Sequence, residues 1–218
     1  MKSKWDLTTK QSGAKSAAMV ISACLGAAMI FALTDPVRSS SHLMGHITIE
    51  TPGQLTPDEA SEVYQELADK MARGYADTGY AIVRDYQNWT LYNTSPYLSA
   101  THGNRYVNNY ANDKAIGYER VGDGVVMPEG AVFAKDSFTV TDEDQLLPAP
   151  LFVMEKLAAG KSPDTADWRY VSILPDGTVF GDSQGASADR TIFCHECHIA
   201  VAEDDYLFYV PEEFRASE

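Results

Sequence analysis

The sequence has few cysteines and few positive charges. Only three cysteines occur among its 218 residues. Two of them share one short motif and the third lies in an apolar N-terminal stretch, so no thiols are left for a framework of structural disulfides. Lysine and arginine together number 17 against 31 aspartates and glutamates, which gives a formal net charge of −14. An acidic surface repels phosphate backbones, which argues against nucleic acid as a partner and favours a basic protein.

The sequence also lacks internal repeats and low-complexity tracts. Hydrophobic residues make up 44% of the chain, and 12 tyrosines, 8 phenylalanines and 3 tryptophans supply large side chains for a core. This composition is typical of a globular protein and not of a disordered one. The length is sufficient for one domain with a substantial core and a small N-terminal addition.

Residues 1–34 have the pattern of an export signal. The leading part contains four lysines and one aspartate, and 17 uncharged, mostly apolar residues follow from Ala17 to Leu33. A cleaved signal peptide and a retained membrane anchor fit equally well, because a membrane-spanning helix needs roughly 17–25 residues. Lipidation at Cys24 is a third interpretation, although the apolar run continues past this residue. The signal and the anchor both place the rest of the chain in the periplasm.

We interpret residues 35–54 as a linker and residues 55–218 as the main domain. The linker is rich in serine, proline and glycine. His42 and His46 would share a face on a helix and could then bind a metal ion. The prolines and glycines around them argue against a helix, so we interpret both as solvated loop residues.

The main domain begins with a predicted helix over residues 55–74. Thr56 and Glu59 form a capping box around a proline, and apolar residues then recur at helical spacing. Further helices are predicted at Phe152–Ala159 and Cys194–Ala202. Strands are predicted at Tyr80–Val83, Asn104–Tyr110, Val132–Phe138, Trp168–Leu174, Val179–Phe180 and Tyr206–Val210. The sequence therefore predicts an α+β fold, with an antiparallel β-sheet and packed helices.

The most specific pattern is Cys-His-Glu-Cys-His at residues 194–198. It matches C-x-x-C-H, the attachment motif of a c-type haem. We predict one covalent haem c, with thioether bonds from Cys194 and Cys197 and with His198 as the proximal iron ligand. A zinc site would need a fourth ligand. A redox dithiol would be expected at the start of a βαβ unit, and a disulfide between the two cysteines is the plainest alternative.

The sequence does not assign the sixth iron position. Met127, Met154 and His102 are candidates, but Met154 lies in an apolar stretch that favours core packing. Arg105 has a planar guanidinium that suits a haem propionate, and it also suits the polar face of a strand. His102 fits either a pocket or a turn that precedes this strand. An open sixth position would permit the binding or turnover of a small molecule.

Three segments resemble the cytochrome P460 family. Pro128–Lys135 is similar to the family's D-G-T-V-x-V-K segment, Asp167–Tyr170 to its Gly-x-Trp-aromatic strand, and Cys194–Phe208 to its haem-binding C-terminal segment. The order and spacing of the three agree with the family, and the resemblance covers Trp89–Phe208. The N-terminal helix lies outside it.

The resemblance implies an antiparallel sheet that carries haem c, with His198 as the only protein ligand of the iron. It also implies a location outside the cytoplasm, often a homodimer, and oxidation of hydroxylamine or a similar small nitrogen compound. Electrons would pass to a partner cytochrome or to a membrane electron-transfer complex. The mark of the family is a lysine bonded to the porphyrin edge, which would be Lys135 here. The alternative for Lys135 is an exposed strand lysine.

Two other functions fit the same motif. The related cytochromes c′-beta share the fold, lack the crosslink and bind nitric oxide or carbon monoxide. A membrane-anchored electron-transfer cytochrome c is the other alternative. If the protein oxidises hydroxylamine, a carboxylate in the pocket is expected to accept protons, and Glu129, Asp136 and Glu143 are the candidates. Trp89 and Trp168 are expected to be core aromatics, with Trp168 at the haem edge.

Overall fold

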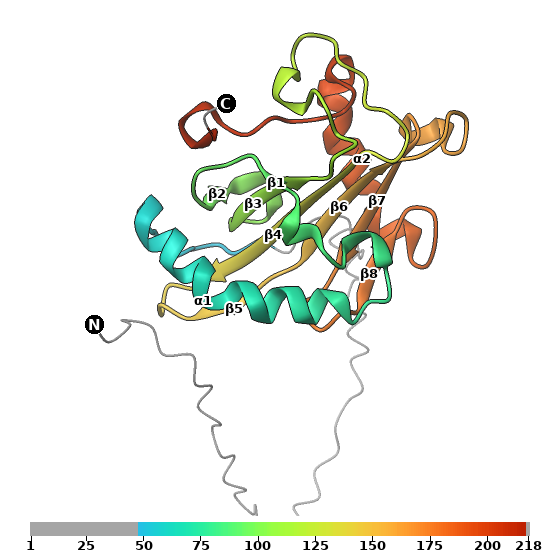
Figure 1. The fold of residues 1–218 in the computed structure, drawn as a ribbon. Coiled ribbons are helices and arrows are strands. Elements are labelled where there is room, and N and C mark those ends of the chain that lie inside the picture. The colour runs from blue at the N-terminus through green and yellow to red at the C-terminus, as the bar shows by residue number, and fades with distance from the viewer. Residues whose placement is uncertain (1–47, 217–218) are drawn as a thin grey trace, which may run out of the picture.

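The computed structural model describes residues 48–216, which form an antiparallel β-sheet with helices packed against it (Figure 1). This arrangement confirms the predicted α+β class. The predicted export segment with Cys24 lies outside the described residues, and so do His42 and His46. Within the described part of the chain, no helix combines the length and the apolar character needed to span a bilayer.

The sheet in this part of the chain has eight strands. Six follow the order β1-β3-β4-β6-β7-β8, while β2 pairs with β3 and β5 pairs with β4. The strands are β1 (Thr90–Leu91), β2 (Tyr97–Ser99), β3 (Arg105–Ala111), β4 (Val132–Val140), β5 (Leu146–Pro148), β6 (Leu151–Lys156), β7 (Trp168–Ile173) and β8 (Val179–Asp182). The strands predicted at β3, β4, β7 and β8 are confirmed, with ends that differ by one or two residues.

The long helix α1 (Pro57–Ala76) begins at the predicted capping box. The Thr56 hydroxyl accepts a hydrogen bond from the Glu59 amide, and the Glu59 carboxylate accepts one from the Thr56 amide. Its buried stripe consists of Ala60, Val63, Leu67, Met71 and Tyr75. Near the end of the helix, a Cβ atom at Gly74 would overlap the carbonyl oxygen of Pro175. The absence of a side chain therefore allows α1 to meet the β7–β8 turn at backbone distance.

The two faces of the sheet carry separate cores. The face under α1 includes Leu151 and Ile173, both fully buried. The other face includes Phe133 and Trp168, and the short helix α2 (Ile192–His198) packs on this side through Cys194. Figure 1 shows the two helices on opposite sides of the central strands. Because side chains alternate along a strand, successive residues of β4 face opposite sides, so that Phe133 belongs to the core beside α2 and Ala134 to the core under α1.

The helix predicted at Phe152–Ala159 is wrong, because β6 occupies most of this segment. The strand pairs with β4 on one side and with β7 on the other. Since both of its faces are covered, it carries a nearly continuous apolar run, and such a run does not distinguish a buried strand from a helix.

Two predicted strands are also wrong. Residues Ala81–Val83 form a 3₁₀ turn, and the segment Tyr206–Val210 pairs with no strand. Three of its backbone carbonyls accept hydrogen bonds from side chains instead, at Tyr206, Phe208 and Val210. The helix predicted at Cys194–Ala202 is confirmed in part, since α2 ends at His198 and a kinked 3₁₀ segment continues to Asp204.

Candidate functional site

A large cavity lies between the sheet and α2. It has about 850 Å³ of empty space, including its open mouth. Its lining comes from β3, β4, β6, β7 and α2, from the turn before β3, from the segment between β3 and β4, and from the segment after α2. Most of the lining side chains are aromatic or aliphatic, and none of them is an aspartate or a glutamate. The apolar character of this lining suits a mostly apolar ligand.

The helix α2 brings the three residues of the C-terminal motif to one wall of this cavity. Cys194, Cys197 and His198 all line it, and both cysteines are free thiols. Burial raises the pKa of the Cys194 thiol to about 12. Because disulfide exchange needs a thiolate, burial makes the Cys194 thiol a poor nucleophile for such exchange. Within residues 48–216, no three histidine, cysteine or acidic side chains are arranged to hold a metal ion, so the zinc interpretation gains no support.

The imidazole of His198 has a defined orientation. Its Nδ1 donates a hydrogen bond of 2.7 Å to the backbone carbonyl of Tyr206. The rings of Tyr170 and Phe208 flank it, at centroid distances of 5.7 Å and 5.3 Å. Burial lowers the pKa of His198 to about 4, and the positive charge of Lys135 acts in the same direction. The ring is therefore neutral, with the proton on Nδ1 and the lone pair of Nε2 available to a metal ion.

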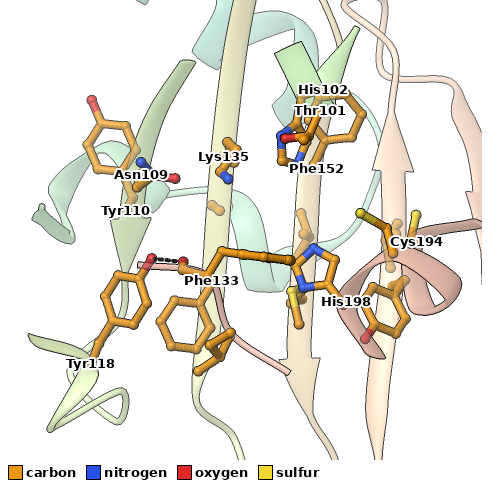
Figure 2. Close-up of a pocket in the computed structure, with 18 of the residues that line it drawn as sticks. Thr101, His102, Asn109, Tyr110, Tyr118, Phe133, Lys135, Phe152, Cys194 and His198 are labelled. Carbon is orange, nitrogen blue, oxygen red and sulfur yellow. Dashed lines mark hydrogen bonds between the residues drawn. The ribbon is translucent and has the colours of Figure 1, made fainter. Parts of the chain in front are cut away.

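Lys135 projects into the same cavity from the middle of β4 (Figure 2). Its neighbours in the sheet are Asn109 on β3 and Phe152 on β6. Burial lowers the pKa of the Lys135 amine to about 8. No residue of the described chain forms a hydrogen bond or salt bridge with its Nζ. The interpretation of Lys135 as an exposed strand lysine is wrong, because its side chain lines the cavity and is only partly exposed.

The wall that faces His198 across the cavity is formed by Thr101, His102 and Phe152 (Figure 2). His102 ends a 3₁₀ turn before β3. Its Nδ1 lies 2.9 Å from the Ser99 hydroxyl, and its ring lies 5.2 Å from that of Phe152. The turn itself therefore places His102 in the cavity, whereas the polar outer face expected for the following strand is wrong, because every residue of β3 is buried.

Several aromatic residues of the site carry no recognisable sequence signal. Tyr118 is buried and its hydroxyl donates a hydrogen bond of 2.9 Å to the Phe208 carbonyl, as Figure 2 shows. Its ring lies 4.6 Å from that of Phe133. Tyr118 comes from the irregular segment between β3 and β4, where neither strand nor helix periodicity exists to indicate which side chains point inward.

The three carboxylates considered as proton acceptors do not line the cavity. Glu129 and Glu143 are exposed in loops. Asp136 is fully buried, but it lies on the face of β4 opposite to Lys135, where it accepts hydrogen bonds from Tyr64 and Tyr86. The expectation of a carboxylate among these candidates is wrong, because strand alternation and loop position direct them elsewhere.

The remaining candidates divide between the site and its surroundings. Met154 lines the cavity, whereas Met127 and Trp168 are buried outside its lining. Trp89 packs partly buried against the core under α1, as expected. Arg105 is buried beside the cavity wall, and its Nη1 donates a hydrogen bond of 2.8 Å to the His102 carbonyl. Its Nε has no partner among the described residues.

Comparisons with known proteins agree with the resemblance seen in the sequence. A family model described as Cytochrome P460 matches residues 83–209, which is more than half of the chain. The matched range contains every strand of the sheet, α2 and all the cavity residues named above, and it leaves out α1. A search of curated proteins finds no match.

Proposed function

Because the chain belongs to the cytochrome P460 family and is therefore a haem cytochrome, we propose that it carries one covalent haem c and oxidises hydroxylamine or a similar small nitrogen compound. The observation that carries this proposal is the position of Lys135. Its amine enters the same cavity as Cys194, Cys197 and His198. Burial of a lysine amine that has no ion partner among the described residues is costly, and a bond to the porphyrin would account for it.

The residues of the cavity fit a haem. The walls are mostly apolar, two thiols lie on one of them, and a neutral imidazole held by a backbone carbonyl lies beside the thiols. Cys194 and Cys197 would hold the porphyrin through thioether bonds, and His198 would bind the iron. Lys135 would hold the porphyrin edge through a further bond. When bound, the haem supplies a redox-active iron that takes electrons from the substrate.

The protein's own groups would serve the substrate in two ways. The wall of Thr101, His102 and Phe152 confines a small molecule and excludes water from part of the cavity. Oxidation of hydroxylamine releases protons, and His102 can accept a proton in this wall in place of the missing carboxylate. Lys135 has a pKa of about 8, so a substantial fraction of its amine is neutral and nucleophilic at neutral to slightly alkaline pH.

The absence of a lining carboxylate favours a second candidate function. An apolar pocket with few proton acceptors also suits the binding of nitric oxide or carbon monoxide without turnover, as in the cytochromes c′-beta. In the third candidate, a plain electron carrier, Met154 or His102 would bind the sixth iron position, since both line the cavity. In each case we propose export to the periplasm and a basic redox partner for this acidic chain; a homodimer is a further proposal.

The reduced absorption spectrum separates these functions. We expect the purified protein to show a ferrous band well to the red of ordinary haem c, as a crosslinked porphyrin should. Lys135→Leu should abolish this band and hydroxylamine oxidation, while the haem stays attached. Lys161→Leu, which changes an exposed lysine, is the matched control and should retain both. The gas-binding function would be established instead by three results together: an ordinary haem c spectrum of the reduced protein, binding of carbon monoxide, and no oxidation of hydroxylamine.

A further inference from the structure

Behind His198 lies a buried ion pair that the proposed function does not use. The Lys156 amine at the end of β6 lies 2.6 Å from the Asp205 carboxylate, and their side chains are only 11% and 7% exposed. The amine also lies 4.7 Å from the centre of the Trp168 ring and donates a hydrogen bond to the Ala166 carbonyl. A charged pair taken out of water in this way needs such additional contacts to be tolerated.

Every polar group of Asp205 is engaged. Its second carboxylate oxygen accepts a hydrogen bond of 2.8 Å from the Met127 amide. Its backbone carbonyl accepts one of 2.9 Å from the Trp168 indole. Contacts from β6, β7 and the segment before β4 therefore converge on this residue and hold it in place.

Asp205 and its neighbour Tyr206 have an unusual backbone conformation. Both residues lie in the left-handed region, with φ angles of 52° and 64°. The backbone of residues other than glycine rarely adopts this region, and two such residues in succession persist only when the surroundings impose the conformation. The contacts to the Asp205 side chain provide that constraint, because they anchor the first of the two residues to the sheet.

The turn so formed presents the Tyr206 carbonyl to His198. This carbonyl accepts the Nδ1 hydrogen bond of 2.7 Å that orients the imidazole. We propose that Lys156 and Asp205 are positioning residues that hold the Tyr206 carbonyl against His198 and so set the basicity of the iron ligand. This inference rests on the proposed function, because it assumes that His198 binds haem iron.

The physical consequence concerns the reduction potential. A carbonyl that accepts the Nδ1 proton gives the imidazole more anionic character, which favours ferric over ferrous iron. Loosening the turn should weaken this hydrogen bond and favour the ferrous form. Mutation of such supporting groups typically changes metal affinity or activity by about 10- to 100-fold. We therefore expect a shift of about tenfold in the ferric–ferrous equilibrium, which corresponds to about 59 mV for one electron.

The test compares Lys156→Met and Asp205→Asn with the wild-type holoprotein. Both variants should raise the reduction potential and lower the frequency of the iron–histidine stretching band in resonance Raman spectra. Asp205→Asn keeps the size of the side chain, so it carries the test if Lys156→Met fails to fold. Lys156→Arg, which retains the charge pair, should keep a potential close to wild type.

The matched control is Asp182→Asn. Asp182 is also a buried carboxylate in an ion pair, at 2.7 Å from Arg169, but its hydrogen bonds lead to Tyr80 and Gln184 and not to the turn at Tyr206. This variant should lose stability without any change in potential. An unchanged potential and Raman band in haem-loaded Asp205→Asn would overturn the inference. A wild-type protein without covalent haem would instead overturn the proposed function, so the two failures are distinguishable.

Discussion

Lys135 and Asp136 are adjacent in β4, but their side chains lie in different cores. Lys135 enters the cavity beside α2, whereas Asp136 lies under α1 and accepts hydrogen bonds from Tyr64 and Tyr86. Burial acts on both groups by disfavouring the charged form, so it lowers the pKa of the lysine to about 8 and raises that of the aspartate to about 6. One short stretch of strand thus carries an amine of lowered pKa on one face and a buried acid of raised pKa on the other.

The first prediction concerns the reactivity of Lys135. Only a neutral amine attacks an acylating reagent, and burial should bring Lys135 to half neutralisation at about pH 8. In a haem-free Cys194→Ala/Cys197→Ala variant, acetylation of Lys135 should therefore rise with a midpoint near pH 8, measured by peptide mass spectrometry. A model lysine peptide, with its ordinary pKa of about 10.4, is the reference. Equal midpoints for the two would show that the amine is fully solvated.

The second prediction concerns Asp136 and stability. The pKa of Asp136 is raised from 3.8 to about 6, so the folded state binds the proton more tightly than the unfolded chain does. Stability should therefore fall as pH rises from about 4 to about 6, by up to about 3 kcal/mol from this group. Asp136→Asn cannot ionise, so it should lack this component and gain stability relative to wild type as pH rises from about 4 to about 6. Urea unfolding at pH 4.5 and pH 7 measures both effects.

Asp182 provides a control of opposite sign for the same measurement. Burial alone would raise its pKa, but hydrogen bonds from Arg169 and Tyr80 lower it below the ordinary value. The stability that this carboxylate contributes is present at neutral pH and is lost as pH falls through its folded pKa. Asp182→Asn should therefore reduce stability at pH 7 more than at pH 3. If the stability lost or gained relative to wild type changed with pH in the same direction in Asp136→Asn and in Asp182→Asn, the raised pKa of Asp136 would be contradicted.

The third prediction concerns Gly74 in α1. A glycine-to-alanine change inside a helix ordinarily stabilises it by up to about 1 kcal/mol. At Gly74 the new methyl group would overlap the Pro175 carbonyl oxygen, which belongs to backbone and cannot rotate away. Gly74→Ala should therefore destabilise the protein by about 1–3 kcal/mol, as overpacking typically does. Thermal unfolding measures the change, and a higher melting temperature would show that α1 can move off the sheet.

The fourth prediction concerns His102. If this residue accepts protons from the substrate, His102→Ala should reduce hydroxylamine oxidation by about 10²-fold or more, since general base catalysis contributes on this scale. The content and ferrous spectrum of the haem should stay as in wild type. A change from a low-spin to a high-spin spectrum in this variant would instead identify His102 as an iron ligand, which is the electron-carrier function.

The fifth prediction concerns covalent attachment. The intact mass of the exported protein should exceed that of its polypeptide by one haem, and Cys194→Ala/Cys197→Ala should remove this excess. Cys24→Ala is the matched control, because it also removes a thiol but leaves the motif intact, and it should keep the haem. Colourless wild-type protein from a host that matures c-type cytochromes would refute the haem assignment as a whole.

What the sequence determined by itself depends on residues close together in the chain. The capping box at Thr56 and Glu59 defines the start of α1, because both partners lie within one helical turn. The C-x-x-C-H motif at residues 194–198 likewise needs only local spacing to place two thiols and an imidazole on one helix. The covalent role of these three residues stays a prediction, although the structure places them on one wall of the cavity.

Only the tertiary structure decided which residues meet across the chain. The apolar run at 151–156 became a strand because β4 and β7 cover both of its edges, and nothing local distinguishes that outcome from a helix. Because successive side chains of β4 point to opposite faces of the folded sheet, Lys135 enters the cavity and Asp136 points away from it. The pairing of Lys156 with Asp205, 49 residues apart, exists only because the segment after α2 folds back onto the sheet. Such contacts arise from burial shared by distant segments, which no short sequence pattern records.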